Sequence, residues 1–256
     1  MSSIGIIPAR LNASRFPNKP MKLIHGMPMV GHCYHRTALA LGNENTFVAT
    51  CDEEIARYIR SEGGQVIMTS VAHTRAMTRT AEAIQSIEKI ANKHLEYVVM
   101  VQGDEPLVPP SVIVETVRHL EGSGADIVNV MSRFTKLEDF LDKNNVKVVI
   151  NQFNDALYFS REPIPSIWKG AENIPMYMQT GIIGFHCEAL LRFNSMPESR
   201  LEQIESVDMN RILEAGGRIR MLLTESVTIG VDTIDELVFA EKLMENDGVM
   251  SEYLNK

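Results

Sequence analysis

Three cationic side chains and a hydroxyl lie within ten residues, directly after the first apolar run of the chain. The run Ile4–Ile7 leads into a loop that carries Arg10, Ser14, Arg15 and Lys19. In an open α/β sheet, ligands bind at the carboxyl ends of the strands. Cations, hydroxyls and backbone N–H groups gathered there suit a polyphosphate. The loop therefore predicts an anion site, and taken alone it leaves a solvated basic loop as the alternative.

Two acidic residues far apart in the sequence also follow apolar runs. Asp104 comes soon after the run Tyr97–Val101, and Asp232 follows a shorter run and precedes a helical pattern. Mg²⁺ prefers oxygen ligands and usually takes one or two protein carboxylates together with substrate phosphates. We therefore expect Asp104 and Asp232 to hold one Mg²⁺. The alternatives are a helix N-cap for Asp232, a turn for Asp104, and Glu105 as the functional acid in its place.

The elements that must position these residues alternate between strand and helix. Helical periodicity follows a cap at Asp52 and ends at Gly63, and it recurs over residues 81–91 and 112–120. Eight short apolar runs read as strands, at residues 4–7, 46–49, 66–68, 97–101, 127–131, 146–150, 181–185 and 219–223. This alternation predicts an α/β fold, a mostly parallel central sheet with helices on both faces. No linker divides residues 1–256, so we expect a single domain.

The composition narrows the classes of function. A net charge of −8 argues against general nucleic-acid binding, and no apolar run approaches the roughly 20 residues of a membrane helix. The cysteines, Cys33, Cys51 and Cys187, fit neither a disulfide framework nor a metal motif, so we expect a cytoplasmic protein. Residues 163–178, rich in Pro, Met and polar side chains, read as an excursion that makes a dimer contact.

Beyond these patterns, a series of motifs in fixed order matches a known family. The matching stretches are Pro8-Ala-Arg, Ser14-Arg-Phe-Pro-Asn-Lys-Pro, Gly26-Met-Pro-Met, Val48-Ala-Thr, Gln102-Gly-Asp-Glu-Pro, Asn145-Val-Lys-Val-Val, Ala156-Leu-Tyr-Phe-Ser-Arg, Leu201-Glu-Gln-Ile-Glu and Gly230-Val-Asp-Thr. From Ile6 to about Leu237 the chain resembles the 3-deoxy-manno-octulosonate (Kdo) cytidylyltransferases, or CMP-Kdo synthetases, and more broadly the cytidylyltransferases that activate ulosonic acids.

The resemblance implies a Rossmann-like nucleotidyltransferase fold, a homodimer and a Mg²⁺-dependent reaction. CMP would pass from CTP to the anomeric hydroxyl of Kdo or a related 2-keto-3-deoxy sugar acid, with release of pyrophosphate, in lipopolysaccharide biosynthesis. It implies catalytic roles for Arg10, Lys19, Asp104 and Asp232, the last two as metal ligands. The residues implied in nucleotide binding are Pro8, Ala9, Arg10, Ser14, Arg15, Lys19, Arg79 and Gln102. Those implied in sugar binding are Gln102, Arg161, Gln179 and Asp208.

The chain departs from the family pattern in three segments. The usual His-x-Ser-Gly-Thr-x-Arg reads His73-Thr-Arg-Ala-Met-Thr-Arg, the usual His-Leu-Gly-x-Tyr-Gly reads Gln179-Thr-Gly-Ile-Ile-Gly, and the usual Glu-Gln-Leu-Arg reads Asp208-Met-Asn-Arg. These departures keep two alternatives open: a cytidylyltransferase for another ulosonic acid, such as an amino-Kdo or a nonulosonic acid, or a non-catalytic nucleotide-sugar binder. A dinucleotide-dependent oxidoreductase is disfavoured because no G-x-G-x-x-G follows the first strand.

Overall fold

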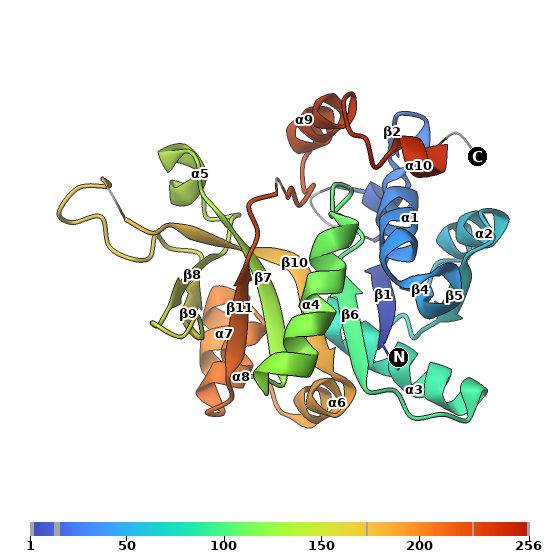
Figure 1. Cartoon of the computed structure of the whole chain (residues 1–256), viewed down its shortest axis with the longest axis horizontal. Coiled ribbons are helices and arrows are strands. Elements are labelled where there is room, and N and C mark those ends of the chain that lie inside the picture. The colour runs from blue at the N-terminus through green and yellow to red at the C-terminus, as the bar shows by residue number, and fades with distance from the viewer. Residues whose placement is uncertain (1–2, 13–15, 173, 227, 255–256) are drawn as a thin grey trace.

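The structure is a computed structural model that describes residues 3–12, 16–172, 174–226 and 228–254. A nine-stranded sheet forms its centre (Figure 1), with the main path ordered β11-β7-β10-β6-β1-β4-β5. All neighbours on this path are parallel except β10, which runs antiparallel to β6 and β7. The strands of the path are β1 Ser3–Ala9, β4 Thr46–Thr50, β5 Gln65–Met68, β6 Tyr97–Val101, β7 Ile127–Arg133, β10 Tyr177–His186 and β11 Ile219–Leu223.

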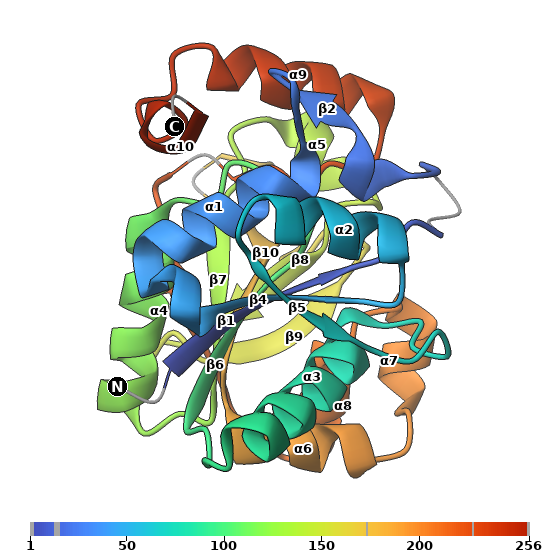
Figure 2. The same ribbon diagram turned by 90° about the vertical axis from the view of Figure 1, so that its right-hand side faces the viewer.

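Strand β1 shows why these runs form a sheet that is buried on both faces. Its side chains alternate, so Ile4 and Ile6 join one apolar cluster and Ile7 joins another. Helices cover each cluster, and Figure 2 shows α1 and α2 on one side of the strands and α3, α6 and α8 on the other. The helices of the first face are α1 Met29–Leu41, α2 Glu53–Ser61 and α4 Pro110–Ser123. Those of the second are α3 Ala76–Ala91, α6 Cys187–Ser195 and α8 Met209–Glu214.

The expected fold class, a mostly parallel sheet with helices on both faces, is confirmed. The elements not anticipated from the sequence include one helix of the first face and one strand. Helix α1 lacks a clean amphipathic pattern because nearly all sides of its first turns are buried. Strand β9 (Ala156–Ser160) pairs only with β8 (Lys147–Ile150), in an antiparallel ribbon that extends the sheet from β10.

The remaining elements lie around the edges of the sheet. Helix α9 (Ile234–Met244) and helix α10 (Ser251–Leu254) lie near β2 (Leu23–Ile24) and α1 at the top of Figure 1. Short elements complete the chain: β3 Met27–Pro28, α5 Leu137–Leu141, α7 Arg200–Glu205, and the 3-10 turns Lys19–Met21 and Asn43–Asn45. Among the described residues, none of the helices has the length and apolar character required to cross a membrane.

Candidate functional site

The ends of four strands that lie next to candidate site residues meet at one edge of the sheet. β1 and β6 end there, antiparallel β10 begins there, and the chain returns there after β11. A cavity of about 270 Å³ opens at this edge. Its lining residues are Pro8, Ala9, Arg10, Phe16, Lys19, Pro20, His73, Thr74, Arg75, Ala76, Arg79, Gln102, Gly103, Asp104 and Asp232. We call it the nucleotide cavity, because the residues that the resemblance implies for CTP line it wherever the structure describes them.

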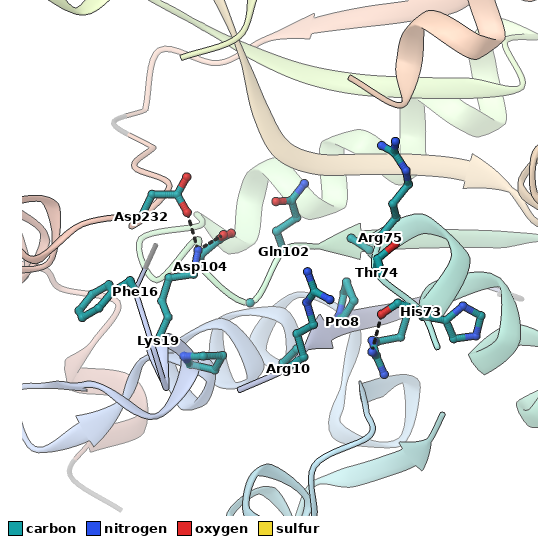
Figure 3. Close-up of a pocket in the computed structure, with 15 residues that line it drawn as sticks. Pro8, Arg10, Phe16, Lys19, His73, Thr74, Arg75, Gln102, Asp104 and Asp232 are labelled. Atoms are coloured by element: carbon teal, nitrogen blue, oxygen red, sulfur yellow. Dashed lines mark hydrogen bonds and ion pairs between the residues drawn. The ribbon is translucent and has the colours of Figure 1, made fainter. Parts of the chain in front are cut away.

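At the centre of this cavity, one ammonium group joins the two acids (Figure 3). Lys19 Nζ lies 2.6 Å from Asp104 Oδ2 and 2.7 Å from Asp232 Oδ1. Burial acts to lower the pKa of Lys19, but the two carboxylates outweigh it and hold this pKa above its usual value. Lys19 therefore remains charged at neutral pH. The structure thus brings a cation of the loop and the two distant acids into one cavity.

A single backbone hydrogen bond places Asp232 beside Asp104. The N–H of Val231 donates to the carbonyl of Asp104 at 2.9 Å, which fixes the returning chain against the loop after β6. The N-cap of α9 is Thr233, whose hydroxyl accepts the N–H of Glu236 in a capping box. The alternative in which Asp232 caps this helix is therefore wrong, and its carboxylate is available to the cavity.

The loop between β1 and Lys19 is closed by contacts at both ends. Asn18 N donates to the carbonyl of Leu11 at 3.2 Å, and Leu11 N donates to Asp52 Oδ2 at 2.9 Å. Asp52 occupies the N-cap position of α2, as expected, but its side chain makes no capping bond and its carboxylate supports the loop instead. Arg10 extends toward Gln102 in Figure 3. Ser14 and Arg15 lie outside the described residues.

Close packing explains the glycine of the Gln102-Gly-Asp-Glu-Pro motif. A Cβ at Gly103 would lie 3.1 Å from the carbonyl oxygen of Pro8. The absence of a side chain therefore lets the loop after β6 approach the end of β1, and this approach brings Asp104 to Lys19.

Glu105, the alternative to Asp104 as the functional acid, lines the neighbouring cavity and is buried against β10. It is 4% exposed, and its Oε1 accepts the N–H of Gly181 at 2.7 Å, where the pairing of β10 with β7 shifts register. Burial, followed by the nearby charge of Asp104, raises the pKa of Glu105 to about 8. Glu105 thus joins the loop that carries Asp104 to the strand that forms the wall of the neighbouring cavity.

A second cavity of about 430 Å³ adjoins the first, and we call it the sugar cavity. Both cavities are lined by Thr74, Arg75, Ala76, Gln102, Asp104 and Asp232, which form the seam between them. The predicted sugar-binding residues Arg161, Gln179 and Asp208 line the sugar cavity. Gln102, assigned to both substrates, lies in the seam.

Arg161 is held by the backbone of its surroundings. Its Nε donates to the carbonyl of Glu205 at 2.8 Å, and its Nη1 donates to those of Lys143 and Asn144 at 3.0 and 3.2 Å. Its Nη2 donates to the carbonyl of Ser206 at 3.4 Å. These bonds join three loops that form the wall of the sugar cavity.

The carboxylate of Glu205 joins two of the family-like motifs. It accepts hydrogen bonds from the hydroxyls of Tyr158 and Ser160 and from the backbone N–H of Arg161, at 2.9 to 3.0 Å. Burial acts to raise the pKa of Glu205, but these donors outweigh it and hold this pKa below its usual value. Nearby Lys147 is fully buried, and its ammonium group donates to three backbone carbonyls.

Two of the departures from the family pattern contact each other. Arg75, at the N-cap of α3, forms an ion pair with Asp208 through its Nη1 and a second with Glu198 through its Nε. Burial raises the pKa of Asp208 even though Arg75 opposes the rise. Figure 3 shows Arg75 extending away from Lys19 and Arg10. The sequence showed both departures, but nothing in it indicated that they form one pair.

Gln179, the third departure, is oriented by a buried amide. Asn129 is fully buried, and its Nδ2 donates to the carbonyls of Val130, Thr180 and Ile182, so its Oδ1 is the acceptor. Gln179 Nε2 donates to that oxygen at 2.7 Å. The amide of Gln179 therefore has a fixed orientation at the wall of the sugar cavity.

Arg79, predicted to bind nucleotide, lines the nucleotide cavity but is 2% exposed. Its Nη1 donates to the Thr69 hydroxyl, and its Nη2 donates to the carbonyl of His73 at 3.1 Å. In this position Arg79 orders the segment that precedes α3.

The two acids fit a divalent cation of the magnesium type. Both carboxylates lie within 2.7 Å of the same nitrogen, so they reach one point in the cavity. Among the described residues, no group of three or more His, Cys, Asp or Glu side chains has the arrangement of a metal site. Two carboxylates completed by phosphate oxygens and water are nonetheless a usual Mg²⁺ environment.

Comparison with known proteins decides the family. The sequence profile of the family described as cytidylyltransferase matches residues 4–221. The chain belongs to the cytidylyltransferase family. Members of this family are nucleotidyltransferases that generally use a divalent metal ion.

Individual members resemble the chain over nearly its whole length. A 3-deoxy-manno-octulosonate cytidylyltransferase of Thermodesulfovibrio yellowstonii is 38% identical over 95% of this chain and 98% of its own. The protein of the same name from Geobacter sulfurreducens is 39% identical over 96% and 99%. A solved CMP:2-keto-3-deoxy-manno-octonic acid synthetase in complex with CTP superposes with a TM-score of 0.85 at 31% identity, over 95% of this chain and 98% of that one. The expected Rossmann-like nucleotidyltransferase fold is thereby confirmed.

Proposed function

We propose that this cytidylyltransferase transfers CMP from CTP to the anomeric hydroxyl of Kdo or a closely related 2-keto-3-deoxy sugar acid, releasing pyrophosphate. The observation that carries the proposal is the convergence of Lys19, Asp104 and Asp232 in one cavity, in a chain 38% identical to a Kdo cytidylyltransferase. The product would be an activated sugar for lipopolysaccharide synthesis.

Charge neutralisation is the main task of the nucleotide cavity. Two unit charges 4 Å apart repel by roughly 4 kcal/mol at an effective dielectric constant of about 20. A triphosphate and a carboxylate brought together therefore need several cations nearby. Lys19 lies in the cavity, and Arg10 lines it. We assign both to the triphosphate, together with Pro8 and Ala9 of the loop backbone, Ser14, Arg15, Arg79 and Gln102.

Asp104 and Asp232 would hold Mg²⁺. That ion would polarise the α-phosphate and neutralise part of its charge. When CTP enters, Lys19 would transfer its contact from the two acids to a phosphate oxygen, because the ammonium and a divalent cation compete for the same carboxylates. Gln102 lines both cavities, and we assign it to orienting the sugar acid against the α-phosphate.

The departures in the sugar cavity favour one variation of this function. Gln179 and Ile183 replace a histidine and a tyrosine of the family pattern, so the cavity satisfies a different set of sugar hydroxyls. A site built to bond particular hydroxyls discriminates strongly against analogues that leave its polar groups unpaired. An amino-Kdo or a nonulosonic acid is therefore the second candidate for the sugar acid.

The assembly and location follow from other features. We propose a homodimer in which residues 163–178 take part, because Trp168 is 88% exposed and residues 163–172, which follow β9, extend from the body of the molecule at the left of Figure 1. We propose a cytoplasmic location, which suits three cysteines that are all free.

The deciding experiment is a pyrophosphate-release assay with CTP, UTP and ATP against a panel of 2-keto-3-deoxy acids. We expect product with CTP and Mg²⁺, and with Kdo or an amino- or nine-carbon analogue. Binding of CTP without pyrophosphate from any acid would instead identify a non-catalytic nucleotide-sugar binder.

A further inference from the structure

The chemistry of the proposed substrate restricts where its carboxylate can lie; this inference rests on the proposed function. In a 2-ulosonic acid, the carboxylate carbon is bonded directly to the anomeric carbon, whose hydroxyl attacks the α-phosphate. The carboxylate therefore lies at the boundary between sugar and nucleotide. A residue that binds it must belong to the seam that both cavities share.

Two cationic residues are candidates for binding this carboxylate. Among the described residues that line the sugar cavity, Arg75 and Arg161 are the cationic ones. Arg161 lines the sugar cavity but not the nucleotide cavity. Each of its three guanidinium nitrogens already donates to a backbone carbonyl. A carboxylate bound by Arg161 would have to displace bonds that hold three loops together.

Arg75 has the geometry that Arg161 lacks. It lines both cavities, and its side chain is 23% exposed. Its Nε and Nη1 meet Glu198 and Asp208, while within the described part of the chain its Nη2 makes no hydrogen bond. A guanidinium carries five N–H donors in one plane, so a further carboxylate can bind along the Nη2 side without loss of the contacts to Glu198 and Asp208.

We propose that Arg75 binds the carboxylate of the sugar acid at the seam, and that Asp208 is the positioning residue that holds it there. Glu198 and Glu202, 3.1 and 3.6 Å from Arg75, complete the support. Glu202 is itself held by Arg211 in a buried ion pair, so the support is anchored in α7 and α8. Arg75, which stands where the family pattern has serine, thus becomes a determinant of substrate binding in this chain.

The test compares the sugar acid with its neutral C1 amide. The probe is Kdo, or whichever acid of the panel the wild type accepts, and the readout is the ratio of kcat/KM for acid over amide. A charge-assisted hydrogen bond predicts that the wild type prefers the acid by about 10- to 100-fold. In Arg75→Gln this preference should fall to near unity, with KM for the sugar raised more than KM for CTP. The matched variant Arg161→Gln should keep the preference while its thermal midpoint falls.

Two further variants test whether misfolding or an unpaired charge, rather than the missing guanidinium, causes the loss of preference in Arg75→Gln. Arg75→Gln/Asp208→Asn removes both charges, so the carboxylate of Asp208 is not left unpaired, and this variant should lose the preference as fully as the single variant. Asp208→Asn alone should weaken the preference less than Arg75→Gln does, because the guanidinium remains but is no longer held.

The inference fails if Arg75→Gln keeps the preference of the wild type, and it fails equally if Arg161→Gln is the variant that loses it. Both outcomes require an active wild type. A wild type that releases no pyrophosphate with any acid of the panel would refute the proposed function itself, and the inference with it.

Discussion

The nucleotide cavity and the sugar cavity share a seam but are stabilised in opposite ways. In the nucleotide cavity, Lys19 meets the side chains of Asp104 and Asp232, and these three groups can be separated by a substrate. At the sugar cavity, backbone carbonyls that fix the loops hold Arg161, and they also hold Lys147, which is buried beside it. Charges of the first kind are free to change partners during a reaction, whereas charges of the second kind maintain the shape of the wall.

The largest expected effect comes from Asp104→Asn, which removes one of the two acids. Turnover should fall by about 100-fold or more, the scale of losing one preorganised electrostatic contact. The matched variant Asp235→Asn changes an exposed acid in the first turn of α9 and should keep wild-type turnover. Rates of pyrophosphate release and far-UV circular dichroism check both variants. Undiminished turnover in Asp104→Asn would remove the metal-binding role.

The second prediction concerns a region outside both cavities. It tests whether the loss of folding stability at acid pH arises there rather than at the site. His32 Nε2 lies 2.9 Å from the carbonyl of Ile24, and Nδ1 lies 2.8 Å from the Tyr253 hydroxyl. Burial, with smaller effects from the nearby charges of Arg36, His35 and His25, lowers the pKa of His32 to about 4.

Because the unfolded chain takes up this proton near pH 6.5 and the folded protein does not, stability is lost as the pH falls through the window from about 6.5 to 4. The loss should total about 3 kcal/mol over that window. Urea unfolding at several pH values checks it, and His32→Gln should flatten the curve. An equal slope in wild type and variant would rule His32 out as the cause.

The third prediction tests the fixed wall of the sugar cavity. Glu205→Gln keeps the shape of the side chain but replaces a carboxylate that accepts three hydrogen bonds. The free energy of unfolding should fall by about 2 kcal/mol, the typical worth of a hydrogen bond to a charged group. KM for the sugar acid should rise while KM for CTP stays close to that of the wild type. A change confined to KM for CTP would contradict the division between the two cavities.

The smallest effect is expected at the capping residue Thr233. Thr233→Ala removes the hydroxyl that accepts from Glu236 and should cost about 1 kcal/mol of stability. Since Asp232 precedes this cap, the Mg²⁺ concentration for half-maximal rate should rise modestly. A metal titration of the rate measures it, with Ser as the substitution that keeps the cap. Equal metal requirements in the Ala and Ser variants would show that the cap does not position Asp232.

The sequence was most informative for site residues that follow a strand closely in the chain. Asp104 and the loop to Lys19 follow apolar runs, so their position at one edge of a parallel sheet followed from the pattern. Antiparallel β10 was recognised as a strand, but its direction was not, because a short apolar run has no polarity. Strand β9 was not predicted, although Ala156-Leu-Tyr-Phe is a short apolar run; in the structure Leu157 is exposed and Tyr158 is half-buried.

Contacts between distant side chains were beyond the reach of the pattern. Arg75 and Asp208 are 133 residues apart, and each alone reads as a surface charge. Lys147 alternates as an exposed strand residue would, yet three carbonyls from neighbouring loops satisfy it in the interior. Such groups are placed by the loops that close over them, which periodicity does not describe.

The bridge made by Lys19 has a consequence for how the enzyme is stored and handled. An ammonium between two acids is an internal counter-ion, so the chain can fold without a metal ion to neutralise the two carboxylates. Chelating agents should therefore abolish catalysis yet leave the melting temperature unchanged, in contrast to small domains whose folding depends on a bound ion.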